Sequence, residues 1–475
     1  MKSHHQNQAR INRLSVAAVL VLTLALLAGC SNTAMVAGLV SVPQGNAVAA
    51  TTEQQAPIGD IDPGVLRVGV SRLEITPLRS AMMGGYGVYV GSIETCRWSQ
   101  GVHDPLYATA MYIGLDDQRL LLISLDLVGL AGPDQDEIKA AIAQRWPIAP
   151  DQVIISSTHT HHSPDTMGLW GTLLPPRTGR DEGYMLYMKS QAVQAAGLAF
   201  ESRRPAQLSY GVGELAEPHW NHYQTQVDDA PIDHTLTVLQ AADFEGRPIV
   251  TVLNWGCHPT CENGDNLLVS SDWVGSYYAI MRRRDVGIPM FINGSIGASI
   301  QPSEPWREQN VGDERQSQGF VWADAVGRAV AQRTIAVLAK LEPLSVDAIK
   351  VESAPVTVTM DNRILGLAKG LGLMPFDLPP MHEQFQTKVT LARIGELWLA
   401  TVPGELSPQI GMTIREAVGG KAQIICGLSQ DYLGYIIDVE QYEDPIYRYE
   451  KMLCVGPDIA DGLIAAHSAL AAELQ

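Results

Sequence analysis

The sequence predicts a protein of the α/β or mixed α+β class, in which helices flank a β-sheet core. Apolar runs of strand length alternate with longer amphipathic segments along most of the chain. Of the 475 residues, 46% are hydrophobic and 18% are charged, which is typical of a globular protein rather than a disordered one. The sequence of the body shows no internal repeat or low-complexity tract.

The folded part is expected to begin near Gly64, with strands that are short aliphatic or β-branched runs. Two of these runs flank the turn residues Phe244-Glu245-Gly246-Arg247-Pro248 and predict a hairpin. The expected strands cover residues 65–70, 108–113, 120–124, 153–157, 235–239, 249–253, 289–292, 351–360, 388–394 and 397–402.

The expected helices are amphipathic and begin at residues that suit a helix N-terminus. Pro133 precedes the helix 134–146, and Asp272 can cap a helix that extends to residue 284. Residues 365–380 are rich in Gly, Pro, Leu and Met and are expected to form a long loop. The other expected helices cover residues 184–202, 319–341, 403–418 and 457–474.

The N-terminus has the pattern of a bacterial lipoprotein signal. Lys2, Arg10 and Arg13 precede the apolar run 14–27, and Leu27-Ala28-Gly29-Cys30 resembles a lipobox. We expect a signal peptide at 1–29, lipidation of Cys30, a flexible tether at 30–62 and a folded body at 63–475. Ser31 after the cysteine favours an outer-membrane anchor, on the periplasmic side or at the cell surface. A plain signal peptide or a transmembrane anchor is the alternative.

The formal net charge of the chain is −18. Nucleic acids are polyanions that bind basic surfaces, so this charge argues against a nucleic-acid partner. It also disfavours electrostatic docking on anionic lipid.

Five cysteines follow Cys30, an odd number, so at least one is expected to stay unpaired or to pair outside the chain. Cys257 and Cys261 stand on either side of His258 and are compatible with a local disulfide or a metal pair. A structural role is favoured, because exported sites tend to avoid exposed thiols. The five are Cys96, Cys257, Cys261, Cys426 and Cys454.

Three histidines within four positions follow the apolar run 153–157. His159 and His161 would point to one face if the extended conformation continued. Two imidazoles on one face can hold a metal such as zinc. The alternative is a polar loop with hydrogen-bonded histidines, which is also the expectation for His162.

Several later segments have the same form, an apolar run followed at once by polar residues. On its own, His258 is more often a structural histidine, and Glu405 a carboxylate at a helix N-terminus. The turn 293–299 is compatible with an anion-binding nest or with an ordinary tight turn. The tyrosines that follow are compatible with aromatic packing; they are Tyr432, Tyr435, Tyr442, Tyr447 and Tyr449.

In this order the segments resemble the neutral/alkaline, non-lysosomal ceramidase family, from about Val68 to Pro457. Each motif is short, but the order and spacing are specific. The motifs are Ile75-Thr76-Pro77, Met83-Gly84-Gly85-Tyr86, Gly101-Val102-His103-Asp104-Pro105-Leu106-Tyr107-Ala108, Ser157-Thr158-His159-Thr160-His161, Asn254-Trp255 with His258-Pro259-Thr260, Ser271-Asp272-Trp273-Val274-Gly275, Pro403-Gly404-Glu405 and Gly434-Tyr435.

The resemblance implies a ceramidase-like catalytic domain with one Zn²⁺ per chain. The implied ligands are His159, His258, Glu405 and Tyr435. The resemblance also implies His161 as an acid–base neighbour of the metal and Tyr447, or alternatively Tyr449, as an oxyanion donor. Ser299 is the implied catalytic hydroxyl, with Ser295 or no serine as the alternatives. Asn221 and His222 would contact the substrate, and Asp272 would orient a ligand histidine unless it only caps a helix.

Two motifs depart from the family pattern. The family's G-D-x-S-P stretch is replaced by Gly297-Ala298-Ser299-Ile300-Gln301-Pro302, which lacks the aspartate. Trp220-Asn221-His222 stands where the family has an active-site arginine. Because the chain ends at Gln475, we expect it to lack the family's C-terminal immunoglobulin-like domain.

We therefore expect a zinc-dependent amidohydrolase that uses a metal-activated water to cleave the N-acyl amide of ceramide or of another lipid-like or small-molecule amide. The departures leave two alternatives open. One is a zinc hydrolase of an ester, a lactone or a small amide. The other is a catalytically inactive surface lipoprotein with the same fold.

Overall fold

The computed structural model describes residues 63–87, 89–225, 230–312, 319–374 and 378–475, which belong to one compact unit, Asp60–Gln475. The predicted signal peptide 1–29, the lipidation site Cys30 and the tether 30–62 lie outside the described residues. None of the helices in the described ranges is long and apolar enough to cross a lipid bilayer.

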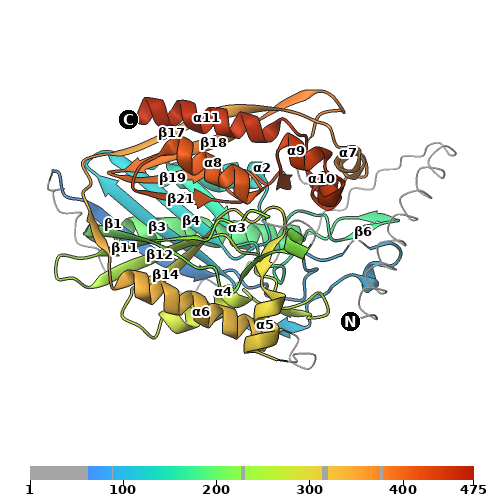
Figure 1. Cartoon of the computed structure of the whole chain (residues 1–475), viewed down its shortest axis with the longest axis horizontal. Coiled ribbons are helices and arrows are strands. Elements are labelled where there is room, and N and C mark those ends of the chain that lie inside the picture. The colour runs from blue at the N-terminus through green and yellow to red at the C-terminus, as the bar shows by residue number, and fades with distance from the viewer. Residues whose placement is uncertain (1–62, 88, 226–229, 313–318, 375–377) are drawn as a thin grey trace, which may run out of the picture. The chain divides into compact units, whose positions relative to one another are not determined.

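Three large mixed sheets form the frame of this unit (Figure 1). In spatial order, the first contains β5 (Val153–Ser157), β4 (Gln118–Leu125), β3 (Tyr107–Leu115), β1 (Arg67–Glu74) and β8 (Arg204–Pro205). The second contains β14 (Ile288–Asn293), β12 (Pro248–Trp255), β11 (Thr235–Ala242), β9 (Gln207–Glu214) and β16 (Glu342–Leu344). The third contains β17 (Ile349–Thr359), β18 (Gln384–Ile394), β19 (Leu397–Thr401) and β21 (Ala422–Cys426).

The same chain path occurs once in each sheet. Two antiparallel strands are followed by a helix and by an edge strand that runs parallel to the second strand. A crossover of this kind brings the carboxyl ends of the parallel strands to the same edge of the sheet. The three paths are β3–β4–α2–β5, β11–β12–α4–β14 and β18–β19–α8–β21, with α2 at Gly132–Ala143, α4 at Trp273–Met281 and α8 at Pro408–Val418.

All three sheets contribute one face to a shared core, and each covers its other face with helices. Met111, Met290 and Leu399, one from each sheet, lie in the shared core. The outer faces pack separately, with α2 and α3 (Glu182–Glu201) on the first sheet, α4 and α6 (Phe320–Leu338) on the second, and α8 and α11 (Ile459–Leu474) on the third. In Figure 1, α11 and α8 cover the third sheet, while α6 and α4 lie along the second.

Burial on both faces explains the continuous apolar run of β5. Side chains of a strand alternate between faces, so Val153 and Ile155 pack under the helices while Ile154 enters the shared core.

Two buried amides join the sheets where the parallel strands end. Asn254, near the end of β12, accepts a hydrogen bond from the backbone N–H of Ile425 in β21 (3.1 Å) and donates to its carbonyl (2.9 Å). Asn293, the last residue of β14, donates to the carbonyl of Thr158, just beyond β5 (2.9 Å). The carboxyl ends of all three parallel pairs therefore meet in one place.

The mixed α+β class with a sheet core flanked by helices is confirmed, and so is the hairpin of β11 and β12. Two expected elements were wrong. The expected helix 403–418 begins only at Pro408, because Glu405 and Leu406 form a short strand, β20. The expected loop 365–380 instead starts within the helix α7 (Arg363–Gly370), whose N-terminus is capped by the Asn362 side chain.

The five cysteines among the described residues are all buried free thiols. Cys257 and Cys261 therefore do not form the local disulfide that their spacing allows. Burial raises the pKa of both thiols well above the usual value, which keeps them protonated. This agrees with the favoured structural role for the pair.

Replacing Asn254 tests whether the buried amide holds two sheets together. In Asn254→Leu the N–H and carbonyl of Ile425 lose their side-chain partner, so we expect a loss of about 3 kcal/mol or more in the free energy of unfolding. Urea unfolding followed by circular dichroism measures it. The matched control is Gln240→Leu, a partly buried amide on β11 with one bond to Thr251, for which we expect less than about 1 kcal/mol. Equal losses in the two variants would contradict this account.

Candidate metal centre

The candidate centre lies where the three sheets meet, and each ligand candidate follows a strand of a parallel pair. His159 comes two residues after β5, and His258 comes three residues after β12. Glu405 follows β19 and begins β20, which pairs in parallel with β22 (Tyr435–Ile436). In this register Glu405 lies directly opposite Tyr435. The tertiary fold therefore brings together four residues that are distant in sequence.

The side chains of His159, His161, His258 and Glu405 converge on one point. The three histidines each offer a ring nitrogen, and these nitrogens all lie within 4.8 Å of one another. Glu405 Oε2 is 3.1 Å from His258 Nε2 and 3.5 Å from His159 Nε2. The side chains of these three residues are nearly inaccessible to solvent. A compact set of imidazole and carboxylate donors suits Zn²⁺.

Backbone carbonyls fix the tautomers of two of the histidines. His159 Nδ1 lies 2.5 Å from the carbonyl oxygen of Val128, and His258 Nδ1 lies 2.6 Å from that of Ile300. A carbonyl oxygen only accepts, so each Nδ1 carries the hydrogen and each Nε2 presents a lone pair to the centre. This is the arrangement found in metal-binding histidines. The other oxygen of Glu405, Oε1, accepts a hydrogen bond of 2.7 Å from the Tyr432 hydroxyl.

His161 reaches the centre by a different route from the one expected. His159 has a φ of +71°, so the extended conformation does not continue, yet the Nε2 atoms of His159 and His161 are 3.2 Å apart. The His161 ring packs on the main chain of Gly85 and on the edge of Tyr86. Its Nδ1 has no hydrogen-bond partner among the described residues. No carbonyl fixes its tautomer, which leaves this ring free to exchange protons.

The charges at the centre favour a cation. Burial raises the pKa of Glu405, but the charges and hydrogen bonds of His159 and His258 outweigh burial and hold that pKa well below its usual range. Burial, reinforced by the other histidines, holds the pKa of His161 well below its usual range. An ionised carboxylate and the neutral imidazole of His161 thus lie at one centre, and these are the protonation states that metal binding requires.

Of the candidate tyrosines, Tyr435 and Tyr449 lie near the centre. Their rings are 5.7 Å apart. Burial and the charge of Glu405 raise the pKa of Tyr435 well above its usual value. The same two causes raise the pKa of Tyr449 to about 12, although this residue is 51% exposed. Tyr447 instead packs against Tyr223, with ring centroids 4.8 Å apart. The structure therefore places Tyr449, the alternative to Tyr447, beside the predicted ligand Tyr435.

Ser299 belongs to a second polar group next to the centre. It precedes Ile300, whose carbonyl holds His258, and its hydroxyl donates to Glu450 Oε1 (3.2 Å). The Tyr223 hydroxyl lies 2.7 and 2.8 Å from the two oxygens of Glu450, which is fully buried. Ser295, the alternative serine, is buried against Gly411 in α8 and its hydroxyl has no partner among the described residues.

Asn221 and His222 lie next to the Ser299 turn. Asn221 pairs with Ile300 in a small sheet, and its amide bonds the carbonyl of Pro231 and the N–H of Tyr223. The backbone N–H of His222 donates to the carbonyl of Ser299 (3.3 Å), and its side chain is exposed. Asn221 thus shapes the turn, while His222 stands at the surface beside it.

Sequence reasoning missed two residues of this region, Tyr432 and Glu450. Tyr432 belongs to the tyrosine cluster that the sequence singles out, but only the structure shows its bond to Glu405. Glu450 follows Tyr449, and nothing in the pattern distinguishes this fully buried glutamate from an exposed one. Asp272, expected either to orient a ligand histidine or to cap a helix, caps α4 through the N–H of Trp273.

No profile of a known protein family matches the chain. Among curated proteins it is similar to neutral ceramidase A of Dictyostelium discoideum, with 28% identity over 132 residues, or 26% of this chain and 18% of that protein. Neutral ceramidase B of the same organism is 26% identical over 147 residues, or 29% of this chain and 20% of that protein. The matched segments span about a fifth of the length of these relatives.

Among solved structures the chain resembles the neutral ceramidase from Pseudomonas aeruginosa. The TM-score is 0.72 at 19% identity, and the likeness covers 87% of this chain and 75% of that one. A ceramidase complexed with C2 gives a TM-score of 0.70 at 18% identity, over 86% and 75% of the two chains. The predicted resemblance to neutral ceramidases is thus confirmed, and the chain has their fold.

Removing one charge tests the centre. Glu405→Gln keeps the shape of the side chain but removes the carboxylate that faces His159 and His258, so we expect zinc affinity to fall by about 100-fold or more. Competition with a chromophoric chelator measures the affinity. Glu396→Gln, on the exposed turn before β19, is the control and should bind zinc like the wild type. An unchanged affinity in Glu405→Gln would rule out this centre.

A second substitution tests the position of His161. A Cβ on Gly85 would come within 2.4 Å of His161 Cγ, so Gly85→Ala must displace the ring, and we expect zinc affinity to fall by about 10-fold. The control is Gly91→Ala, which has a similar positive φ of +109° but no atom within 4 Å of the new methyl group. It shares the backbone strain without the clash. Equal zinc affinities in the two variants would show that the ring position is unimportant.

Proposed function

We propose that the chain is a zinc-dependent hydrolase that cleaves the N-acyl amide bond of a ceramide-like or other lipid-like amide. The observation that carries the proposal is the convergence of two Nε2 lone pairs, of His159 and His258, on the Glu405 carboxylate, with each Nδ1 held by a carbonyl. The similarity to proteins named neutral ceramidases supports the substrate class.

Zinc at such a centre would supply a water nucleophile that ionises near neutral pH and would polarise a substrate carbonyl. Glu405 stays ionised and supplies negative charge to hold the ion. His161, whose Nε2 faces the centre 3.2 Å from His159 Nε2, is placed to accept a proton from the attacking water. It returns that proton to the leaving amine nitrogen as the C–N bond breaks. The products are a carboxylic acid and an amine.

Tyrosine hydroxyls are suited to the charge that develops on the substrate. The high pKa of Tyr449 keeps its hydroxyl protonated at neutral pH, so that it can donate a hydrogen bond. A donor aimed at the carbonyl oxygen stabilises the transition state more than the ground state, because the negative charge appears only there. We assign this role to Tyr449 in preference to Tyr447.

The polar group around Ser299 favours a second candidate function, hydrolysis of an ester, a lactone or a small amide. The Ser299 hydroxyl is held by the buried Glu450, and the exposed His222 stands beside this turn. Both features differ from the serine loop and the arginine of the family that the sequence resembles. Compared with that family, these two features would change the groups that contact the substrate, while the candidate metal ligands stay the same.

The predicted lipid anchor at Cys30 accords with an amide substrate that lies in a membrane. An exported enzyme tethered to a membrane would encounter such a substrate by diffusion along the membrane surface. We include this anchoring in the proposal as an inference from the sequence pattern.

A substrate panel tests the proposal. The soluble chain from Thr51, loaded with zinc, should hydrolyse a fluorescent N-acylsphingosine faster than matched esters and lactones, and EDTA should abolish the activity. In a His159→Ala/His258→Ala double variant we expect the rate to fall by about 1000-fold or more, because the ion is lost. His382→Ala, an exposed histidine, is the control. Turnover in the double variant would refute the metal mechanism, and faster ester or lactone cleavage would favour the second candidate.

A further inference from the structure

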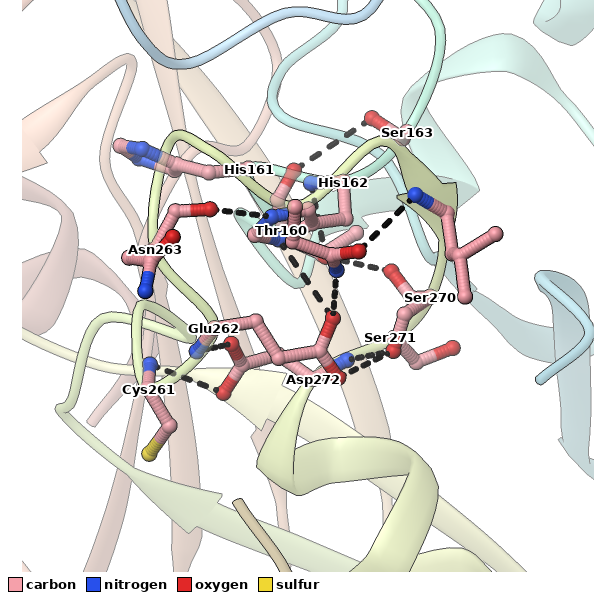
Figure 2. Close-up of polar contacts among 12 residues, drawn as sticks. Thr160, His161, His162, Ser163, Cys261, Glu262, Asn263, Ser270, Ser271 and Asp272 are labelled. Carbon is pink, nitrogen blue, oxygen red and sulfur yellow. Dashed lines mark hydrogen bonds and ion pairs between the residues drawn. The ribbon is translucent and has the colours of Figure 1, made fainter. Parts of the chain in front are cut away.

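A second set of possible metal-ligand atoms includes His162, the residue that directly follows His161 of the candidate centre. His162, Glu262 and Asp272 each offer one atom, and these atoms all lie within 4.8 Å of one another. All three side chains are at most 1% exposed. They come from the loop after β5 that holds His159, His161 and His162 (the histidine loop), the loop after β12 and the N-cap of α4, and Figure 2 shows them gathered around Ser270.

The orientation of His162 is set by one backbone carbonyl. Its Nε2 lies 3.1 Å from the carbonyl oxygen of Asn263, so Nε2 carries the hydrogen and Nδ1 has a lone pair. Nδ1 is fully buried, has no hydrogen-bond partner among the described residues, and lies 3.9 Å from Glu262 Oε2. A lone pair and a carboxylate repel each other at this distance unless a positive charge lies between them.

Hydrogen counting at Ser270 leads to the same conclusion. Its Oγ is 2.5 Å from Asp104 Oδ2 and 2.7 Å from Glu262 Oε1, and it accepts a hydrogen bond from the N–H of Asp272. The hydroxyl has one hydrogen, which can serve only one carboxylate. The other contact requires a proton on a carboxyl group, or a cation that draws the oxygens together.

Apart from His103, which has a ring nitrogen within 4.8 Å of carboxylate oxygens of Asp104 and Glu262, the protein supplies little positive charge to these carboxylates. Within the ranges that the structure describes, Asp104, Glu262 and Asp272 form no ion pair with a lysine or an arginine. Arg97, which lies near His162, donates instead to the carbonyls of Gly84, His161 and Asn266. Buried carboxylates without a counter-charge are costly, so they are expected to hold protons or a metal ion.

Burial also raises the proton affinity of the cluster. It raises the pKa of Asp272 to about 7, and burial together with the charge of Asp272 raises that of Glu262 to about 10. Three backbone N–H groups nevertheless point at Asp272, which is how an ionised carboxylate is held. The hydrogen-bond geometry therefore suits ionised carboxylates, whereas burial disfavours their negative charge unless a cation is bound.

We propose that His162, Glu262 and Asp272 bind a divalent transition-metal ion, such as Mn²⁺ or Zn²⁺, at a site separate from the candidate centre. One imidazole nitrogen with carboxylate oxygens is a ligand set for such ions, whereas Ca²⁺ and Mg²⁺ prefer oxygen alone. Asp104 is close enough, through Ser270, to add a further carboxylate. An ion here supplies the missing positive charge and replaces the protons.

The site would brace the loop after β5, which carries the ligand candidate His159 and its neighbour His161. The histidine loop is tied to the segment before α4 by the hydroxyl of Thr160, which donates to the carbonyl of Ser270, and by the N–H of Ser270, which donates to the carbonyl of His162. In Figure 2 the ring of His161 points away from the cluster. Adjacent histidines thus serve separate sites, and an ion at the second would hold the backbone of the first.

Thermal unfolding of the soluble chain, loaded with one equivalent of zinc so that the second site stays available, tests the proposal. We expect added Mn²⁺ to raise the Tm of the wild type more than that of Glu262→Gln, and electron paramagnetic resonance to show about 100-fold weaker Mn²⁺ binding in the variant. In EDTA, Glu262→Gln should be at least as stable as the wild type, because it has one fewer buried acid. Asp265→Asn, an exposed acid in the same loop, is the control and should respond to Mn²⁺ like the wild type.

Two results would overturn the proposal. Equal responses to Mn²⁺ in the wild type and Glu262→Gln would show that Glu262 is only a neutral, hydrogen-bonded acid. An equal gain in Tm from Ca²⁺ would exclude an ion chosen by the imidazole of His162. Both comparisons involve proteins that retain the candidate zinc centre, so they are independent of the proposed hydrolase activity.

Discussion

The structure depends on the hydrogen bonds that join three sheets at the carboxyl ends of their parallel strands. Asn254 and Asn293 bring three otherwise separate strand ends together, through backbone groups of Ile425 and Thr158. A buried amide is costly unless its donors and its acceptor are satisfied, and here each amide finds partners both within its own sheet or its loops and on a neighbouring sheet. The arrangement that satisfies these polar groups also brings the ligand candidates together.

The repeated chain path explains why the chemistry collects at one edge. In each sheet the crossover helix returns the chain so that two parallel strands end side by side, and loops after such ends are where α/β proteins place their sites. His159 follows the first pair, His258 the second and Glu405 the third. The loops can vary while the strands keep their positions, which accounts for a changed serine turn beside unchanged ligand candidates.

Most strands and helices could be predicted from sequence because their apolar periodicity is local. The predicted bounds of β5, residues 153–157, are the observed ones, because burial on both faces makes this strand continuously apolar. The helix after Glu405 was misplaced, because pairing between β20 and β22 depends on a segment thirty residues later in the chain. The prediction that His159 and His161 point to one face required an extended backbone, but the φ of +71° at His159 interrupts that conformation.

The sequence by itself determined the fold class, the segments that bear the chemistry and the ligand candidates, because these depend on residue type and short-range spacing. Only the tertiary structure decided that Tyr449 lies nearer than Tyr447 to Tyr435, that Glu450 holds Ser299, and that His162 faces buried carboxylates. These outcomes depend on contacts between segments far apart in the chain. A tyrosine or a glutamate has the same local pattern whether it faces solvent or a buried charge.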